Sequence, residues 1–258
     1  MLKLQDINYT IGAKQILSGI QINFEPGKLH MILGPNGSGK TSLLKIASGQ
    51  IQNYNGSVFY DNHLISQIPT ATLATYRSYL SQQNNIPFPL TVAQLIQMGR
   101  YPHYSYEPTK NDFKVINEVV NKLEISHLLN RDFNTLSGGE QQRVQFARVL
   151  AQVWEKGTNN NRYLFLDEPL NNLDIQYQKY LLQTIREFIK EDLVVIMIVH
   201  DINWALAYAD KVYFLNKGTL VAQGNPTEII NEKLIMEVFN ITSKIISVPG
   251  QNYPLVCF

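Results

Sequence analysis

The sequence has 258 residues, of which 45% are hydrophobic and 17% charged, with a formal net charge of +1 at pH 7. This length suits one large domain or two modest ones, and the nearly balanced charge disfavours wholesale binding to nucleic-acid phosphates. No stretch stays apolar over the roughly 18 residues that a membrane-spanning helix needs. The single cysteine, Cys257, cannot form an internal disulfide, as is usual in a reducing cytoplasm.

The first third of the chain is predicted to consist mostly of strands. Apolar alternation and turn residues predict strands or hairpin arms over 2–9, 16–24, 28–33, 56–65 and 77–83. One helix is expected over 41–48, directly after a glycine-rich loop. A strand, a glycine loop and a helix therefore follow one another at residues 28–48.

The middle of the chain changes character. Apolar residues at three- and four-residue spacing predict amphipathic helices over 91–98, 111–125 and 137–154. Strands and helices then alternate again, with strands expected over 163–167, 193–199 and 211–215 and helices to about 190 and over 202–208. We read the stretch 241–258 as one or two closing strands.

Apolar strands that alternate with helices predict an α/β fold with a mostly parallel sheet covered on both faces. An antiparallel β portion is expected at the N-terminus. We expect a single domain over 1–258, in which a helical subdomain, 87–150, is inserted between the two parts of the core, 1–86 and 151–258.

The segment "GPNGSGKT" matches the phosphate-binding pattern G-x-x-x-x-G-K-[ST]. Glycines let backbone N–H groups converge on phosphate oxygens, and the following helix adds its positive end. The lysine is expected to reach the β- and γ-phosphates, and the threonine hydroxyl to bind Mg²⁺. The residues expected to hold ATP here are Gly34, Pro35, Asn36, Gly37, Ser38, Gly39, Lys40, Thr41 and Ser42.

Three polar side chains follow two of the apolar strands. Asp167 and Glu168 end "YLFLDEP", and His200 ends "LVVIMIVH". Ligands of such sheets bind at the carboxyl ends of the strands. Asp167 is therefore expected to hold Mg²⁺ through water, Glu168 to orient or deprotonate the attacking water, and His200 to contact the γ-phosphate. The alternatives are a solvated acidic pair and a histidine satisfied by backbone groups.

Two further candidates are weaker on sequence alone. Gln82 follows the strand "YLS" and could touch the metal or the attacking water, although Gln83 beside it leaves the register open. Tyr9 could stack on adenine, or it could be a tyrosine packed in the sheet. The remaining histidines, among them His103, have no metal-ligand spacing and are interpreted as structural or solvated.

Together these residues resemble the ATP-binding subunits of ABC transporters over essentially the whole chain. The resemblance identifies Tyr9 as the A-loop aromatic, Gln82 as the Q-loop and His200 as the switch. It identifies "LSGGE" (136–140) as the signature and "NNLD" (171–174) as the D-loop. Two departures are visible. Leu170 and Asn171 stand where the family more often has Thr and Ser, and the stretch from Leu136 to Asp167 is longer than usual, with "WEKGTNNNR" (154–162) filling the excess.

The resemblance implies a head-to-tail pair of chains with two ATP molecules between them. Each ATP would be held by Tyr9, the phosphate loop, Gln82, Asp167, Glu168 and His200 of one copy. It would be covered by Ser137, Gly138 and Gly139 of the other copy, with Asp174 beside it. Lys40, Gln82, Glu168 and His200 are the implied catalytic residues, and Thr41, Gln82 and Asp167 the implied Mg²⁺ ligands.

The motif "TVAQLIQMGRYPH" (91–103) resembles importer subunits for iron chelates, haem and cobalamin. The stretch "TATLATYRSYLSQQ" (70–83) and the insert after "ARVLAQVW" resemble haem importer subunits most closely. Such subunits lie on the cytoplasmic face of the cell membrane, bound to a permease dimer. The permease receives its cargo from a substrate-binding protein. The other cargoes remain alternatives. A different-class alternative is a non-transport ABC ATPase that acts on nucleic acid or ribosomes, although near-neutral charge and the lack of a coiled coil disfavour it.

Overall fold

The computed structural model describes residues 1–81, 86–155 and 161–258. Its larger sheet has the strand order β10-β9-β3-β8-β7-β6. The strands from β9 to β6 are parallel, and β10 is antiparallel to β9. The strands are β3 (Lys28–Leu33), β6 (Arg77–Leu80), β7 (Arg162–Asp167), β8 (Leu193–Ile198), β9 (Lys211–Asn216) and β10 (Thr219–Gly224).

The N-terminal strands form a second, antiparallel sheet in the order β2-β1-β4-β5. These are β1 (Leu2–Ile11), β2 (Lys14–Phe24), β4 (Asn55–Tyr60) and β5 (His63–Leu64). The sequence-based prediction of a mostly parallel sheet with an antiparallel N-terminal portion is thus confirmed.

The side chains of β8 divide the core into two layers. Leu193, Val195 and Met197 face one apolar cluster, and the alternating residues Val194, Ile196 and Ile198 face the other. This is the two-residue period of a strand buried on both faces. The second cluster fills the space between the parallel sheet, the antiparallel sheet and α1 (Lys40–Ala47).

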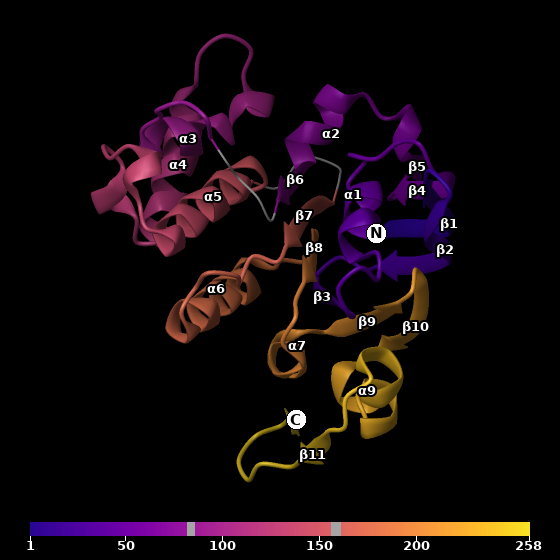
Figure 1. Cartoon of the computed structure of the whole chain (residues 1–258). Helices are drawn as coiled ribbons and strands as arrows, with labels where there is room; N and C mark the ends of the chain where they lie inside the picture. Colours follow the sequence, from indigo (N-terminus) through magenta and orange to yellow (C-terminus); the bar gives the residue numbers. More distant parts are fainter. Residues whose placement is uncertain (82–85, 156–160) are drawn as a thin grey trace.

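The first cluster lies under most of the remaining helices. In Figure 1, α3 (Val92–Met98), α4 (Lys110–Lys122) and α5 (Gly138–Gln152) lie together at the end of the molecule far from β1 and β2. Each begins with a capping box, at Thr91, Thr109 and Ser137. The buried Arg100 ties this group together, because it donates to Asp112 at 2.9 Å and to the carbonyl of Ala151 at 2.8 Å.

The other helices are α2 (Thr70–Tyr76), α6 (Ile175–Phe188), α7 (Ile202–Tyr208), α8 (Pro226–Ile229) and α9 (Glu232–Phe239). Short 3₁₀ turns span η1 (Ile65–Gln67), η2 (Tyr101–His103), η3 (Ser126–Leu128) and η4 (Phe133–Thr135). Within the described ranges, no helix is both long enough and apolar enough to cross a bilayer. The sequence-based reading did not include α2, β10, α8 or α9.

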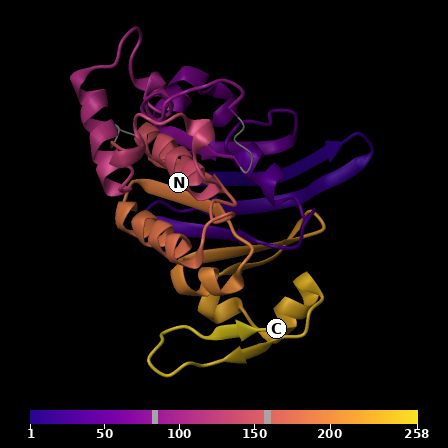
Figure 2. The ribbon, with the colours of Figure 1, turned by 60° about the vertical axis from the view of Figure 1, so that its left-hand side comes forward.

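The chain closes with a small hairpin, β11 (Lys244–Ile246) and β12 (Leu255–Cys257), confirming the expected closing strands. It lies at the edge of the molecule in both views of the ribbon (Figures 1 and 2). The Asn203 side chain on α7 both donates to the carbonyl of Val256, at 3.1 Å, and accepts from its N–H, at 2.8 Å. The hairpin is therefore fixed to the helix that follows His200.

Candidate functional site

The phosphate loop connects β3 to α1, and two of its glycines are required by the geometry. A Cβ at Gly34 would lie 2.1 Å from the carbonyl oxygen of Leu215, and φ there is +150°. A Cβ at Gly39, where φ is +101°, would lie 2.7 Å from the side chain of Leu17. Any larger residue would push the loop away from the sheet edge, so the curl of the loop depends on both glycines.

Lys40 begins α1 and folds back over the loop. Its ammonium donates to the carbonyls of Gly34, at 2.9 Å, and Pro35, at 3.0 Å. Burial lowers the pKa of Lys40, and the nearby carboxylates of Glu168 and Asp167 oppose that shift. The loop thus holds a partly desolvated cation at its centre, where an anionic group is the natural partner.

The Ser38 side chain shares this enclosed environment. It is 2% exposed, and its hydroxyl has no hydrogen-bond partner among the residues that the structure describes. A buried hydroxyl without a partner is uncommon and is consistent with a place for a polar ligand.

Thr41 and Tyr79 hold the carboxylate of Asp167 from two sides. Thr41 donates to Oδ1 at 3.2 Å, and Tyr79 donates to Oδ2 at 3.0 Å. Burial raises the pKa of Asp167, and the two hydroxyl donors oppose that rise. A hydroxyl and a carboxylate that converge in this way fit Mg²⁺, which prefers oxygen ligands.

Glu168 follows β7 in the left-handed region, with φ of +52°. His200 approaches it from the end of β8, and His200 Nε2 lies 2.8 Å from Glu168 Oε1. On its other oxygen, Oε2, Glu168 accepts a hydrogen bond of 2.6 Å from Asn171. The glutamate is 10% exposed and the histidine 43% exposed at the side chain. The general base expected from the sequence is thus nearly enclosed and contacted on both oxygens.

One cavity of about 500 Å³ is lined by part of the phosphate loop together with Glu168 and His200. It is lined by Lys14, Ile16, Asn36, Gly37, Gly39, Lys40, Thr41, Ser42, Glu168 and His200. The parallel strand order explains the gathering, because the loop after β3 and the residues after β7 and β8 emerge at one sheet edge.

Several expected site residues that the structure describes do not line this cavity. They are Gly34, Pro35, Ser38 and Asp167, and also Tyr9, Ser137, Gly138, Gly139 and Asp174. Tyr9 is half-buried in β1, opposite Leu17 of β2. Ser137 is exposed at the start of α5, where its hydroxyl accepts from the N–H of Glu140. Asp174 caps α6 by accepting from the N–H of Tyr177 at 2.8 Å.

Gly138 and Gly139 follow Ser137 in the first turn of α5. Space around Gly138 is open, and a Cβ at Gly139 would have as its nearest neighbours Asn172 and Leu173, at 3.8 Å. The signature therefore lies beside the turn that leads to α6, separate from the phosphate loop of the same chain. Gln82 and Gln83 are outside the described residues.

Sequence reasoning missed Tyr79, Asn171, Lys14 and Ile16. Tyr79 lies in a strand that the sequence predicts, but only the sheet order shows that this strand is next to β7, with Tyr79 in register with Phe165. Asn171 was visible only as a departure from the family pattern. Lys14 and Ile16 belong to a strand whose approach to the phosphate loop depends on the packing of the two sheets.

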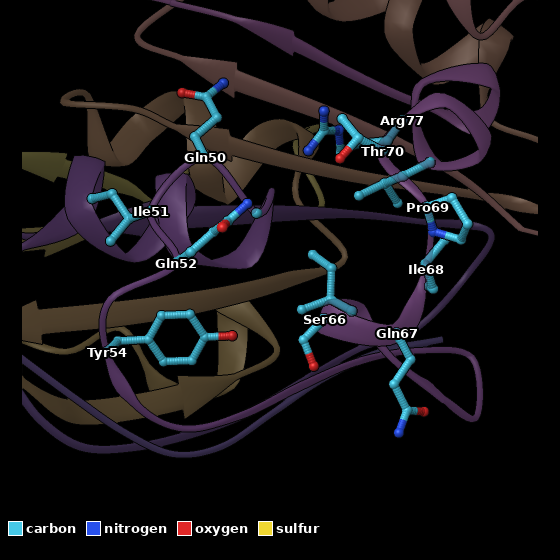
Figure 3. Close-up of a pocket in the computed structure, with 13 residues that line it drawn as sticks. Gln50, Ile51, Gln52, Tyr54, Ser66, Gln67, Ile68, Pro69, Thr70 and Arg77 are labelled. Carbon is cyan, nitrogen blue, oxygen red and sulfur yellow. The ribbon is translucent and has the colours of Figure 1, made fainter.

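A second cavity, of about 730 Å³, lies between the end of α1, the η1 turn and α2. Figure 3 shows Arg77, Tyr54 and the amides of Gln50 and Gln52 around it, together with apolar Ile51, Ile68 and Pro69. None of the phosphate-loop residues lines this cavity, so it is a separate feature of the surface.

Comparison with known proteins agrees with this geometry. Residues 17–171 match the ABC transporter family. The hemin import ATP-binding protein HmuV of Mesorhizobium japonicum is 35% identical over 257 residues, covering 99% of this chain and 97% of that protein. HmuV of Escherichia coli O157:H7 is 34% identical, covering 99% and 98%.

Solved structures give the same picture. An inward-facing transporter of the metal-chelate type superposes with a TM-score of 0.81 at 22% identity, covering 99% of this chain and 96% of that chain, which concerns the fold alone. The dimeric cassette MJ0796 superposes with a TM-score of 0.75 at 26% identity, covering 88% and 99%. The fold and the site define a P-loop ATPase. The chain belongs to the ABC transporter family, as an ATP-hydrolysing subunit.

Proposed function

We propose that this chain powers the import of haem by binding and hydrolysing ATP in the cavity beside the phosphate loop. The observation that carries the proposal is the gathering of Lys40, Thr41, Asp167, Glu168 and His200 at one sheet edge, in a chain whose relatives are hemin import proteins over 99% of its length. MJ0796, which is similar at 26% identity, has been solved with ADP and phosphate bound.

The triphosphate is expected to replace the internal partners of Lys40. The ammonium that now donates to Gly34 and Pro35 can turn toward the phosphate oxygens. Thr41 and Asp167 would hold Mg²⁺, with Gln82 as a further ligand. Bound there, the ion neutralises charge that develops on the phosphates. Tyr9 is the proposed adenine contact.

Glu168 is the proposed general base, and His200 the proposed partner that holds it and contacts the γ-phosphate. A carboxylate can accept a proton from the attacking water only if it lies within hydrogen-bond reach of it. Phosphoryl transfer depends mainly on positioning and charge stabilisation. The 2.8 Å contact between His200 and Glu168 supports this pairing.

A second copy of the chain is the proposed source of the remaining contacts. Ser137 and Gly138 are exposed, and they begin a helix of 15 residues whose first N–H groups can face an anion. They do not line the cavity of their own chain. The proposal is that they cover the ATP held by the partner, so that the site is completed only when two chains meet.

The second proposed partner is an integral-membrane permease dimer, which in turn receives cargo from a substrate-binding protein. The helical subdomain, 87–150, is the proposed contact, with Gln82 as the link to the nucleotide. The chain would then lie on the cytoplasmic face of the membrane, bound through the permease.

Reconstitution tests the cargo. The complex of this chain with its permease is placed in liposomes, and ATP hydrolysis is measured with haem, a ferric chelate or cobalamin on the binding-protein side. We expect stimulation by haem. Stimulation by cobalamin or a ferric siderophore alone would replace haem as the cargo and leave the ATPase assignment intact.

Affinity capture tests the different-class alternative. The full chain is expected to retain a membrane permease from detergent-solubilised membranes. Retention of ribosomes or DNA in its place would move the chain to the non-transport ATPases.

A further inference from the structure

The turn that follows Glu168 is unusually constrained. Glu168 and Asn172 both have left-handed backbones, with φ of +52° and +62°, a conformation that non-glycine residues adopt at a cost. Between them, the N–H of Asn171 donates to the carbonyl of Glu168 at 3.3 Å. Strain of this kind persists only where the surroundings hold the backbone in place.

Two glutamines from different helices provide that support. Gln142 on α5 donates to the carbonyl of Pro169 at 3.1 Å. Gln178 on α6 donates to the carbonyls of Leu170 and Leu173, both at 3.1 Å. Backbone groups on both sides of Asn171 are thereby fixed, so the direction of its side chain is fixed as well.

The fixed side chain points at the proposed base. Asn171 Nδ2 lies 2.6 Å from Glu168 Oε2, while His200 Nε2 lies 2.8 Å from Oε1. A carboxylate oxygen accepts hydrogen bonds, so the amide group facing it must be the NH₂ end. Such a bond to a charged acceptor is among the stronger neutral-donor contacts in proteins.

We propose that Asn171 is a positioning residue that sets the orientation of the Glu168 carboxylate for hydrolysis. His200 and Asn171 together fix the plane of the carboxylate, and an amide cannot take part in proton transfer at neutral pH. Its effect is therefore on turnover and leaves nucleotide binding unchanged.

This inference rests on the proposed function, since it assigns Asn171 a role through Glu168. The test uses the full chain and measures kcat and KM for Mg-ATP together with the affinity for a fluorescent ATP analogue. Asn171→Leu removes the donor at similar size, and Asn171→Ser keeps a shorter one. We expect Asn171→Leu to lower kcat by about tenfold or more, with KM and affinity unchanged, and Asn171→Ser to retain more of kcat.

A matched control exists on α4. Asn111 donates to Glu155 at 2.8 Å, the same kind of amide-to-carboxylate bond at an exposed place far along the chain from Glu168. Asn111→Leu is expected to leave kcat at the parent value. If both leucine variants lowered kcat equally, the effect would be one of general stability and the proposal would be wrong.

A double-mutant cycle separates positioning from structural support. In a Glu168→Gln background, adding Asn171→Leu is expected to leave the residual rate unchanged, because the group that it orients is gone. A further loss of the same size as in the parent would overturn the proposal. Should Asn171→Leu fold poorly, kcat is compared between Asn171→Ser, which keeps a donor, and Asn171→Asp, which places a second carboxylate beside Glu168. We expect the serine variant to have the higher kcat, and equal kcat values would overturn the proposal.

Variants of Glu168 and of Asn171 distinguish the two proposals. If Glu168→Gln hydrolyses ATP at the parent rate, the proposed base is wrong. If Glu168→Gln is inactive and Asn171→Leu keeps kcat within twofold of the parent, only the role of Asn171 is wrong.

Discussion

His200 Nε2 lies 2.8 Å from Glu168 Oε1, although the two residues end different strands, 32 positions apart. The contact exists because β7 and β8 are adjacent and parallel, with Asp167 opposite Ile198. Both polar side chains therefore extend beyond the same end of the sheet.

Replacing Glu168 with glutamine removes the proposed base and keeps its size. We expect turnover to fall by about a hundredfold or more, since general-base catalysis contributes on this scale. ATP affinity should be retained, and the variant should accumulate as an ATP-bound dimer. Phosphate release measures turnover, and size-exclusion chromatography in the presence of Mg-ATP measures the ATP-bound dimer. A variant that turns over at the parent rate would exclude Glu168 as the base.

Replacing Lys40 with alanine removes the cation at the centre of the phosphate loop. A charged hydrogen bond of this kind is worth about 1.5–3 kcal/mol, so ATP affinity should fall by roughly 10- to 100-fold. Titration of a fluorescent nucleotide measures the loss. Lys114→Ala, on the exposed face of α4, serves as the control. Equal affinities in the Lys40 variant and the parent would contradict the placement of the lysine.

Replacing Ser137 with arginine places a bulky side chain at the exposed start of α5. ATP binding to a single chain should be unaffected, because Ser137 does not line the cavity of its own chain. Dimer formation with Mg-ATP and turnover by the assembled transporter should be lost. Gln223→Arg, at an exposed position outside the helical subdomain, is the control. Unchanged turnover would remove the proposed contact with the partner's ATP.

His30 links stability to pH. It is buried in β3, within hydrogen-bond distance of the Tyr213 hydroxyl and the Glu25 carbonyl, and burial lowers the pKa of His30 from 6.5 to about 4. The folded protein therefore holds it neutral, whereas the unfolded chain protonates it below pH 6.5. Its contribution to stability is complete above that pH and is lost as the pH falls toward 4.

Acidification from pH 7 to pH 5 should thus lower the free energy of unfolding by about 2 kcal/mol through this residue alone. Urea denaturation at several pH values measures the slope. His30→Gln should flatten the pH dependence between pH 6.5 and 4, and His127→Gln should leave it as in the parent. An unchanged slope in the His30 variant would show that another group is responsible.

Features that depend on residues close together in the sequence could be predicted, whereas features that depend on tertiary packing could not. The phosphate loop is one contiguous motif, so the sequence alone identified it. Asp167, Glu168 and His200 stand at the ends of apolar strands, and these positions were enough to predict them as site residues. The contact between Asn171 and Glu168 depends on two left-handed residues, which no pattern of apolar residues indicates. Helix α2 was missed because its sequence, "TATLATY", is rich in threonine, and tertiary packing outweighs that weak helix preference.

The two hydrogen bonds between Asn203 and Val256 affect how the protein loses activity on heating. Gln178 uses one end of its amide to hold the turn after Glu168 and the other to accept from Trp204 on α7, at 2.9 Å. The same helix is bound through Asn203 to the last hairpin. Small peripheral elements with little buried area open more readily than a central sheet. Detachment of the hairpin would release α7 and then the turn, so hydrolysis is expected to be inactivated at a lower temperature than the one at which the parallel sheet melts.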